Sequence, residues 1–251
     1  MKIARVSFKN KISWAIIEDK TIRFIRGEPF GRIKAGNTRV SLGKVRLLVP
    51  ATPSKIILAG LNYRDHAREL NMKLPKEPVI FLKPPSSLIA QGQDIIYPER
   101  AGRIDYEGEL ALVIKKKCRK IPMSKAVDYI LGYTCLNDIT ARDLQKKDGQ
   151  WTRSKSFDTF CPVGPWLETQ ACPDKLRIRT YLNGAPRQDS SCSNFIFPVD
   201  YLVSFISSVM TLNPGDIIST GTPPGVGEIN PQDKICVEID GIGRLENRVV
   251  K

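Results

Sequence analysis

Two glutamates two positions apart are the first residues in this sequence whose spacing could do chemistry. They lie in IDYEGELALVI, residues 104–114, which has the composition of a strand. Residues two apart on a strand point to the same face, with Cα atoms roughly 6.6 Å apart. Glu107 and Glu109 would therefore place two carboxylates side by side, at one end of a strand that continues into a core. Two such charges are costly to bury unless a cation lies between them, so the spacing raises the question of which cation that is.

A third carboxylate follows further along the chain. Asp138 ends the short strand-like stretch YTCLND and precedes TARDLQ, which reads as the start of a helix. If the two strands are neighbours, Asp138 joins the two glutamates. Carboxylate oxygens suit the hard cations Mg²⁺ and Mn²⁺, Ca²⁺ less well, and do not favour zinc. The alternative is that Glu107 and Glu109 lie at the surface and pair with Arg103.

The only histidine of the chain has a carboxylate within reach. His66 lies in GLNYRDHARE, and Glu69 follows three positions later, so the two side chains would be neighbours on a helix. A carboxylate beside an imidazole orients the ring and raises its basicity, as a general base requires. The alternative is an exposed His–Glu pair on a polar helix.

A lysine in apolar surroundings is a further candidate. Lys155 lies in WTRSKSFDTFCPVGPW, and lysine is seldom found in such a stretch. It could hold an anionic substrate or stabilise an enolate, or its aliphatic stem could be buried while the ammonium reaches solvent. The segment STGTPPGVG, residues 219–227, lacks the G-K-[ST] of a phosphate loop, although Thr222 could offer a hydroxyl and a backbone N–H to a carboxylate.

Strand-like segments must position these side chains. Strands are predicted over 79–83, 88–97, 106–114, 133–138, 177–183, 216–220 and 235–240, and helices over 64–72, 124–131 and 198–210, with Ser124 as the cap of the second. Because helices and strands do not alternate strictly, the fold class is α+β with a large mixed sheet. Residues 1–50 form a small β-rich region, and Pro50 and Pro53 mark the boundary to the main domain, 51–251.

Composition describes an ordinary soluble globular protein, with 41% hydrophobic and 26% charged residues among 251. No apolar run reaches the ~18 residues of a membrane span, and the amino terminus lacks a signal-peptide core, so a cytoplasmic protein is expected. Six cysteines without a C-x-x-C pair indicate free thiols. The net charge of +13 is dispersed, and its one dense run, KKKCRK at 115–120, contains no aromatic residue, which does not favour nucleic acid as a partner.

Six motifs in order resemble the fumarylacetoacetate hydrolase family over about residues 55–245: GLNYRDHARE, PVIFLKPPSSLI, DYEGELALVI, GYTCLNDITARDLQ, WTRSKSFDTFCPVGPW and LNPGDIISTGTPPGVG. The resemblance implies a mixed β-roll, a homodimer, and a variable amino-terminal region in the place of residues 1–50.

The resemblance also implies roles for single residues. By it, the metal ligands for Mg²⁺ or Mn²⁺ are Glu107, Glu109 and Asp138. His66 and Glu69 would form an acid/base pair on a segment that closes as a lid, and Lys155 would face the substrate. The remaining substrate contacts would be Arg142, Gln145 and Thr222.

The implied substrate is a small 2-oxo acid that reacts through a metal-bound enolate. The compact length resembles the acylpyruvase and oxaloacetate decarboxylase branch of the family, not the longer true fumarylacetoacetases. Hydrolytic C–C cleavage of an acylpyruvate is the expected reaction, and oxaloacetate decarboxylation and isomerisation of a 2-hydroxy-dienoate are alternatives, because all three reactions share the enolate. Two other classes stay open from the residues alone. One is a metal-free glycosidase that uses Glu107 and Glu109. The other is a non-catalytic protein that binds anions or nucleic acid.

Overall fold

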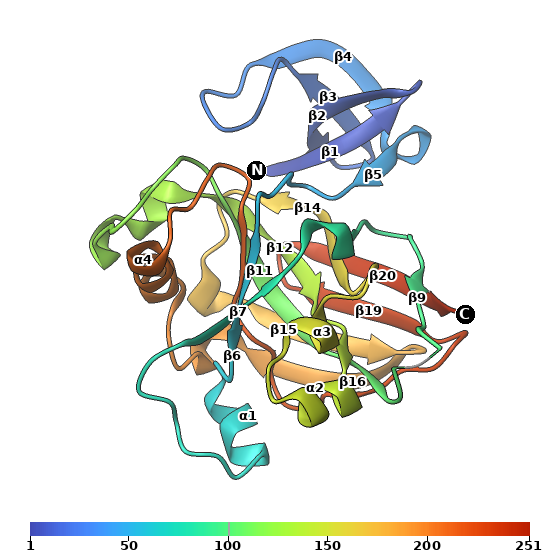
Figure 1. The fold of residues 1–251 in the computed structure, drawn as a ribbon. Coiled ribbons are helices and arrows are strands. Elements are labelled where there is room, and N and C mark those ends of the chain that lie inside the picture. Colours follow the sequence, from blue (N-terminus) through green and yellow to red (C-terminus); the bar gives the residue numbers. More distant parts are fainter. Residues whose placement is uncertain (100) are drawn as a thin grey trace.

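One large sheet organises the chain. The computed structural model describes residues 1–99 and 101–251. Twelve strands form this sheet: β1 (Lys2–Phe8), β2 (Lys11–Glu18), β3 (Thr21–Ile25), β4 (Ala35–Ser41), β5 (Arg46–Leu48), β6 (Ile56–Gly60), β7 (Val79–Lys83), β8 (Leu88–Ile89), β11 (Gly108–Ile114), β12 (Ile130–Asn137), β14 (Cys161–Glu168) and β17 (Ile217–Ser219). Their order is β4-β3-β2-β1-β14-β12-β11-β17-β6-β7, with β5 paired to β1 and β8 to β14 (Figure 1).

Two smaller sheets complete the β-structure of the described residues. The strands of the five-stranded sheet, in spatial order, are β16 (Ala185–Ser191), β15 (Arg177–Leu182), β19 (Lys234–Ile239), β20 (Gly243–Val250) and β9 (Ile95–Ile96). Those of the three-stranded sheet are β13 (Thr140–Ala141), β10 (Ile104–Tyr106) and β18 (Gly227–Glu228). The main core packs Leu110 and Leu112 of β11 with Ile178 and Val237 of the five-stranded sheet. Because β17 runs parallel to β6 while most pairs are antiparallel, the predicted α+β fold with a mixed sheet is confirmed.

In the residues that the structure describes, four α-helices and five 3-10 turns lie between the strands. The α-helices are α1 (Arg64–Glu69), α2 (Arg142–Asp148), α3 (Thr152–Lys155) and α4 (Val199–Val209), and the 3-10 turns are η1 (Leu42–Lys44), η2 (Pro85–Ser87), η3 (Met123–Tyr129), η4 (Pro173–Lys175) and η5 (Cys192–Asn194). The prediction of α4 is confirmed, since its apolar residues at helical spacing are buried. The predicted helix 64–72 ends earlier, at Glu69.

Two predicted elements are wrong in detail. Of the predicted helix 124–131, residues up to Tyr129 belong to the 3-10 turn η3, and Ile130 and Leu131 begin β12. The N-cap of η3 is Pro122, without a side-chain bond from Ser124, and only Ala126 of η3 is buried, so the turn lacks the apolar face that would stabilise an α-helix. The predicted strand 88–97 is two short strands, β8 and β9, in different sheets; the chain turns between them at Gly92, which has a φ of +77°.

The amino-terminal strands extend the large sheet. β1 pairs with β14 through Lys2 opposite Glu168 and Ile3 opposite Leu167, and Figure 1 shows this blue region at one end of the molecule. All six cysteines are free in the described chain. None of the helices in the residues described is long and apolar enough to cross a membrane.

Candidate active site

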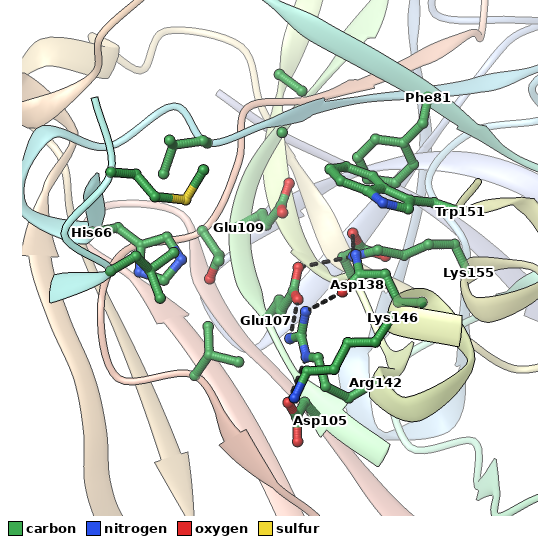
Figure 2. Close-up of a pocket in the computed structure, with 18 of the residues that line it drawn as sticks. His66, Phe81, Asp105, Glu107, Glu109, Asp138, Arg142, Lys146, Trp151 and Lys155 are labelled. Atoms are coloured by element: carbon green, nitrogen blue, oxygen red, sulfur yellow. Dashed lines mark hydrogen bonds and ion pairs between the residues drawn. The ribbon is translucent and has the colours of Figure 1, made fainter. Parts of the chain in front are cut away.

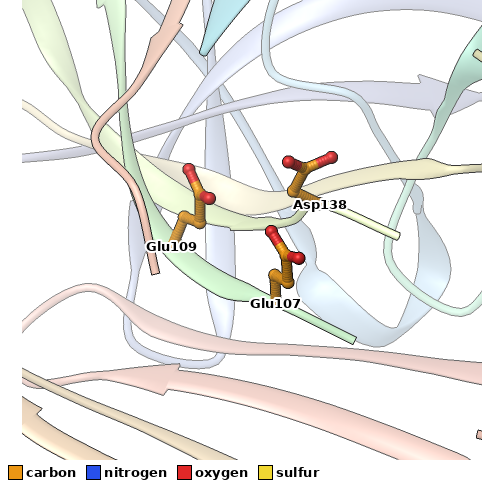
Figure 3. Close-up of side chains that lie close together, drawn as sticks. All are labelled: Glu107, Glu109 and Asp138. Carbon is orange, nitrogen blue, oxygen red and sulfur yellow. The ribbon is translucent and has the colours of Figure 1, made fainter. Parts of the chain in front are cut away.

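Three buried carboxylates converge where β11 begins and β12 ends. The two strands are antiparallel, with Gly108 opposite Asn137, so Glu107 and Asp138 adjoin that pair, and the Asp138 amide donates to the Glu107 carbonyl at 2.8 Å. One carboxylate oxygen from each of Glu107, Glu109 and Asp138 lies within 4.8 Å of the others (Figure 3). The structure therefore brings together the three carboxylates that the sequence singled out, and we call them the triad.

Glu107 and Glu109 do not lie on one continuous strand, although the sequence predicted that they would. The strand is interrupted at Glu107, which lies between β10 and β11. The break coincides with Gly108, where a Cβ would lie 2.2 Å from Thr180 Oγ1, so the backbone there approaches the five-stranded sheet closely. The Glu107 amide leaves the ladder and donates instead to Asn137 Oδ1 at 3.0 Å.

Two buried lysines neutralise part of the triad. Lys155 Nζ donates to Glu107 Oε2 at 2.9 Å and to Asp138 Oδ2 at 2.5 Å (Figure 2). Lys83 Nζ donates to Asp138 Oδ1 and, at 2.9 Å, to the Ile139 carbonyl. Both lysine side chains are at most 2% exposed. The alternative that Lys155 reaches solvent is thus wrong.

An arginine completes the cationic partners. Arg142 Nη2 donates to Glu107 Oε1 at 2.5 Å, while its Nε donates to Asp105 Oδ2 at 2.8 Å. Arg103 pairs with Asp105 and not with Glu107, so the alternative of a surface Glu107–Arg103 pair is wrong. Arg142 Nη1 also donates to Gln145 Oε1 at 2.6 Å. Arg142 and Gln145 line the cavity, as expected of substrate contacts, but they also bind each other.

Glu109 differs from its two neighbours because it forms no ion pair within the described chain. Its Oε2 accepts from Ser219 Oγ and from the Gly221 amide, the latter at 2.9 Å. Burial, together with the nearby charge of Asp138, raises the pKa of Glu109 to about 8. Burial alone would also raise the pKa of Glu107, but Lys155 and Arg142 outweigh it and lower that pKa to about 2.

These contrasts test whether the site fits a divalent cation. The donor set consists of carboxylate oxygens, and one of these buried carboxylates, Glu109, forms no ion pair among the described residues. At neutral pH Glu109 therefore carries a proton unless another positive charge replaces it. Hard cations such as Mg²⁺ and Mn²⁺ prefer such oxygen ligands. Glu107, Glu109 and Asp138 thus fit a divalent metal.

The imidazole lies on the short helix α1. His66 Nδ1 is 2.8 Å from Glu69 Oε2, and the Gly225 amide donates to Glu69 Oε1 at 3.0 Å. His66 as a residue is only 9% exposed, whereas the Glu69 side chain is 42% exposed. The alternative of a fully exposed pair is therefore wrong for the ring. We call His66 and Glu69 the dyad.

Triad and dyad face the same cavity, which has a volume of about 530 Å³. Apolar side chains form part of its wall: Leu61, Leu70, Met72, Phe81 and Trp151. Thr222 also lines the cavity, but its hydroxyl donates to the Gly108 carbonyl at 2.9 Å and accepts from Gln188 Nε2 at 2.8 Å. The side-chain hydroxyl of Thr222 is therefore engaged in hydrogen bonds within the protein, and the role of Thr222 as a substrate contact stays a prediction.

Comparison with known proteins assigns the chain to a family. Residues 55–250 match the family model described as fumarylacetoacetate hydrolase, C-terminal. The chain belongs to the fumarylacetoacetate hydrolase family. Residues 1–50 match a second model, described as Rv2993c-like, N-terminal.

Three relatives in this family bear on the site. The oxaloacetate tautomerase YisK of Bacillus subtilis is 44% identical over 230 residues, which cover 85% of this chain and 76% of that protein. The structure of 5-carboxymethyl-2-hydroxymuconate delta-isomerase from Mycobacterium smegmatis is 42% identical, with a TM-score of 0.95 over 100% of this chain and 99% of the other. Maleylpyruvate hydrolase from Sphingobium, in complex with manganese(II) and pyruvate, is 29% identical, with a TM-score of 0.83 over 100% and 99% of the two chains.

Sequence reasoning missed two charged residues of this site. Lys83 ends the apolar strand VIFLK, and a single lysine there was the available signal. Asp105 precedes the two glutamates in IDYEGEL, where it reads as one more acid, yet it accepts from both Arg103 and Arg142. Their partners come from other strands and helices, so spacing along the chain did not reveal them.

Proposed function

We propose that this protein is a divalent-metal-dependent enzyme that moves a proton at the carbon beside the carbonyl of a small 2-oxo acid. Keto–enol tautomerisation of an oxaloacetate-like diacid is the first reaction we expect. The observation that carries the proposal is that the dyad and the triad line one cavity. A metal-binding carboxylate cluster opposite a His–Glu pair is suited to enolise a carbonyl compound.

A divalent cation held by Glu107, Glu109 and Asp138 would supply a Lewis acid for the oxygens of the 2-oxo acid. Lys155 lies at the same edge of the cavity, where its ammonium can attract the substrate carboxylate or stabilise developing negative charge. The apolar side chains of the cavity wall would limit the access of water to the reacting carbon, which would strengthen both charge interactions.

The dyad would handle the proton. With Glu69 accepting the Nδ1 hydrogen, the other imidazole nitrogen, Nε2, is free to carry a proton between the enol oxygen of the substrate and the carbon beside it. Glu69 is in turn fixed by the Gly225 amide, which holds the ring orientation through the carboxylate. This chemistry needs no water. Tautomerisation and isomerisation therefore require only proton transfer from the site, whereas hydrolysis also requires a bound and activated water.

Hydrolytic cleavage of an acylpyruvate is the second candidate, and it would require the same dyad to activate a water. The name of the Sphingobium relative supports it, at 29% identity. The names of the YisK and isomerase relatives, at 44% and 42% identity, support proton transfer instead. We therefore place tautomerisation before hydrolysis.

A substrate panel with one variant tests the proposal. Enol-to-keto conversion of oxaloacetate, its decarboxylation, dienoate isomerisation and acylpyruvate cleavage would each be assayed with Mg²⁺, with Mn²⁺ and with EDTA. We expect tautomerisation to be fastest, to stop with EDTA, and to fall by about 10²–10⁴-fold in His66→Ala, the usual contribution of a general base.

Mn²⁺ affinity serves as the control, because His66→Ala should leave the triad intact. Faster acylpyruvate cleavage than tautomerisation in the wild type would favour the hydrolase, and EDTA-resistant activity would refute the metal requirement.

A further inference from the structure

An aromatic pair, Phe81 and Trp151, lies beside Lys155. Lys155 Nζ is 5.0 Å from the centroid of the Phe81 ring, and Phe81 packs edge-on against Trp151, with centroids 5.1 Å apart and planes at 76° (Figure 2). We propose that Phe81, held in place by Trp151, positions the Lys155 ammonium over the triad. The role of Lys155 in the reaction rests on the proposed function, but the contact itself does not.

The ammonium needs such a neighbour because it is buried. Two of its three hydrogens have acceptors, one on Glu107 and one on Asp138. A ring face attracts the remaining positive charge, and this attraction is stronger where water is excluded. Lysine also has four rotatable side-chain bonds, so the ring limits where the ammonium can move when a substrate or metal competes for the carboxylates.

Trp151 in turn joins the ring to the helix that carries the lysine. It directly precedes α3, and its carbonyl accepts from Ser154 Oγ at 2.9 Å and from the Lys155 amide at 3.1 Å. The indole lies against Gly60 at the end of β6, where a Cβ would come within 3.0 Å of Cζ3. A side chain at position 60 would therefore displace the indole.

The second lysine of the site is fixed differently. Lys83 lies two residues after Phe81 on β7, and so on the same face of that strand. Its ammonium bonds to Asp138 and to the Ile139 carbonyl. One strand thus supplies a charge that holds a ligand of the triad and a ring that holds Lys155.

A double-mutant cycle tests whether Phe81 acts through Lys155. The variants are Phe81→Leu, Lys155→Met and the two combined. We expect Phe81→Leu to lower kcat on the order of tenfold with a smaller change in KM, Phe81→Tyr to restore most of the loss, and Phe81→Leu to change little once Lys155 is Met. Equal losses in both backgrounds would overturn the proposal.

The same four proteins give a second readout that needs no substrate. Phe81→Leu should lower the thermal midpoint by less in the Lys155→Met background than in the wild type, because the ammonium that the ring stabilises is gone. Phe30→Leu is the matched control, since Phe30 packs edge-on against Trp14 in the amino-terminal region and does not line the cavity. Its effect should be the same with and without Lys155.

If Phe81→Leu lowers the thermal midpoint equally with and without Lys155, as Phe30→Leu should, the positioning role is refuted. If the wild type turns over none of the panel while the midpoints are coupled, the proposed function fails and the positioning of Lys155 stands.

Discussion

The two ends of the cavity are built in opposite ways. The triad end assembles side chains from elements far apart in the chain, and its lysines and carboxylates are at most 10% exposed. The dyad end consists of one short helix, whose His–Glu contact spans three residues and whose glutamate is 42% exposed. Buried charge must be fixed in advance to hold a cation, whereas a base must exchange its proton. Because the two ends are built differently, we expect mutations at the triad end to change metal affinity and mutations at the dyad end to change kcat alone.

Removing the carboxylate of Glu109 should have the largest effect on function. We expect Glu109→Gln to weaken Mn²⁺ binding by more than about 100-fold, above the upper range for loss of an outer-shell partner. Activity should fall at least as much. The thermal midpoint should hold, because Glu109 makes no ion pair among the residues described and its bonds from Ser219 and Gly221 can go to an amide oxygen. A calorimetric titration with Mn²⁺ measures the affinity.

Asp138→Asn is the contrasting control within the triad. Asp138 accepts from both Lys83 and Lys155, so its loss leaves two buried ammonium groups short of a partner. Breaking such a pair typically costs about 3–5 kcal/mol. Asp138→Asn should therefore lower both metal affinity and the free energy of unfolding. Normal Mn²⁺ binding by Glu109→Gln would remove Glu109 from the ligand set.

The parts of the site that could be predicted from sequence are those with a local pattern. The spacing of Glu107 and Glu109, and the three-residue step from His66 to Glu69, give the geometry of each pair directly. Asp105 and Lys83 carry no such pattern, because their partners are set by cross-strand register and by the docking of α2 and α3.

The same contrast holds for the fold. α4 was predictable because its buried residues recur at helical spacing. β14 was missed because CPVGPWLE contains two prolines, which disfavour a central strand, and β16 because APRQDSS has no apolar alternation. Both are strands because their neighbours, β12 and β15, supply the ladder partners.

The pH dependence of metal binding sharpens the comparison at the buried end. In EDTA-treated protein, the pKa of Glu109 is about 8 in place of its ordinary 4.5, so the folded state binds an extra proton between these values. That contribution to stability is complete below about pH 4.5 and is lost as the pH rises through about 8. Because a metal ion replaces the proton, the gain in thermal midpoint on adding Mn²⁺ should be larger at about pH 8.5 than at about pH 6.

Glu109→Gln is again the control, since it has no carboxyl to titrate and should lose this part of the pH dependence. A gain from Mn²⁺ that is equal at both pH values in the wild type would mean that the proton on Glu109 does not compete with the metal.

Glu69→Gln should have the smallest effect, confined to the dyad end. The Glu69 carboxylate uses one oxygen for His66 and the other for the Gly225 amide, and a glutamine has a single oxygen for both. We expect kcat to fall about tenfold, the lower range for loss of a partner that orients another group. Mn²⁺ affinity should not change, and the midpoint should change little because the side chain is half-exposed.

Asp65→Asn on the same helix is the matched contrast. Asp65 accepts from Ser190 of β16 and from Asn194 of η5, and so ties α1 to both elements. Its substitution should lower the thermal midpoint more than Glu69→Gln does and change kcat less. If Glu69→Gln instead weakened Mn²⁺ binding as much as it lowered kcat, the exposed helix would be helping to hold the cation. The two ends of the cavity would then act as one unit, and the separation of proton handling from cation binding would be wrong.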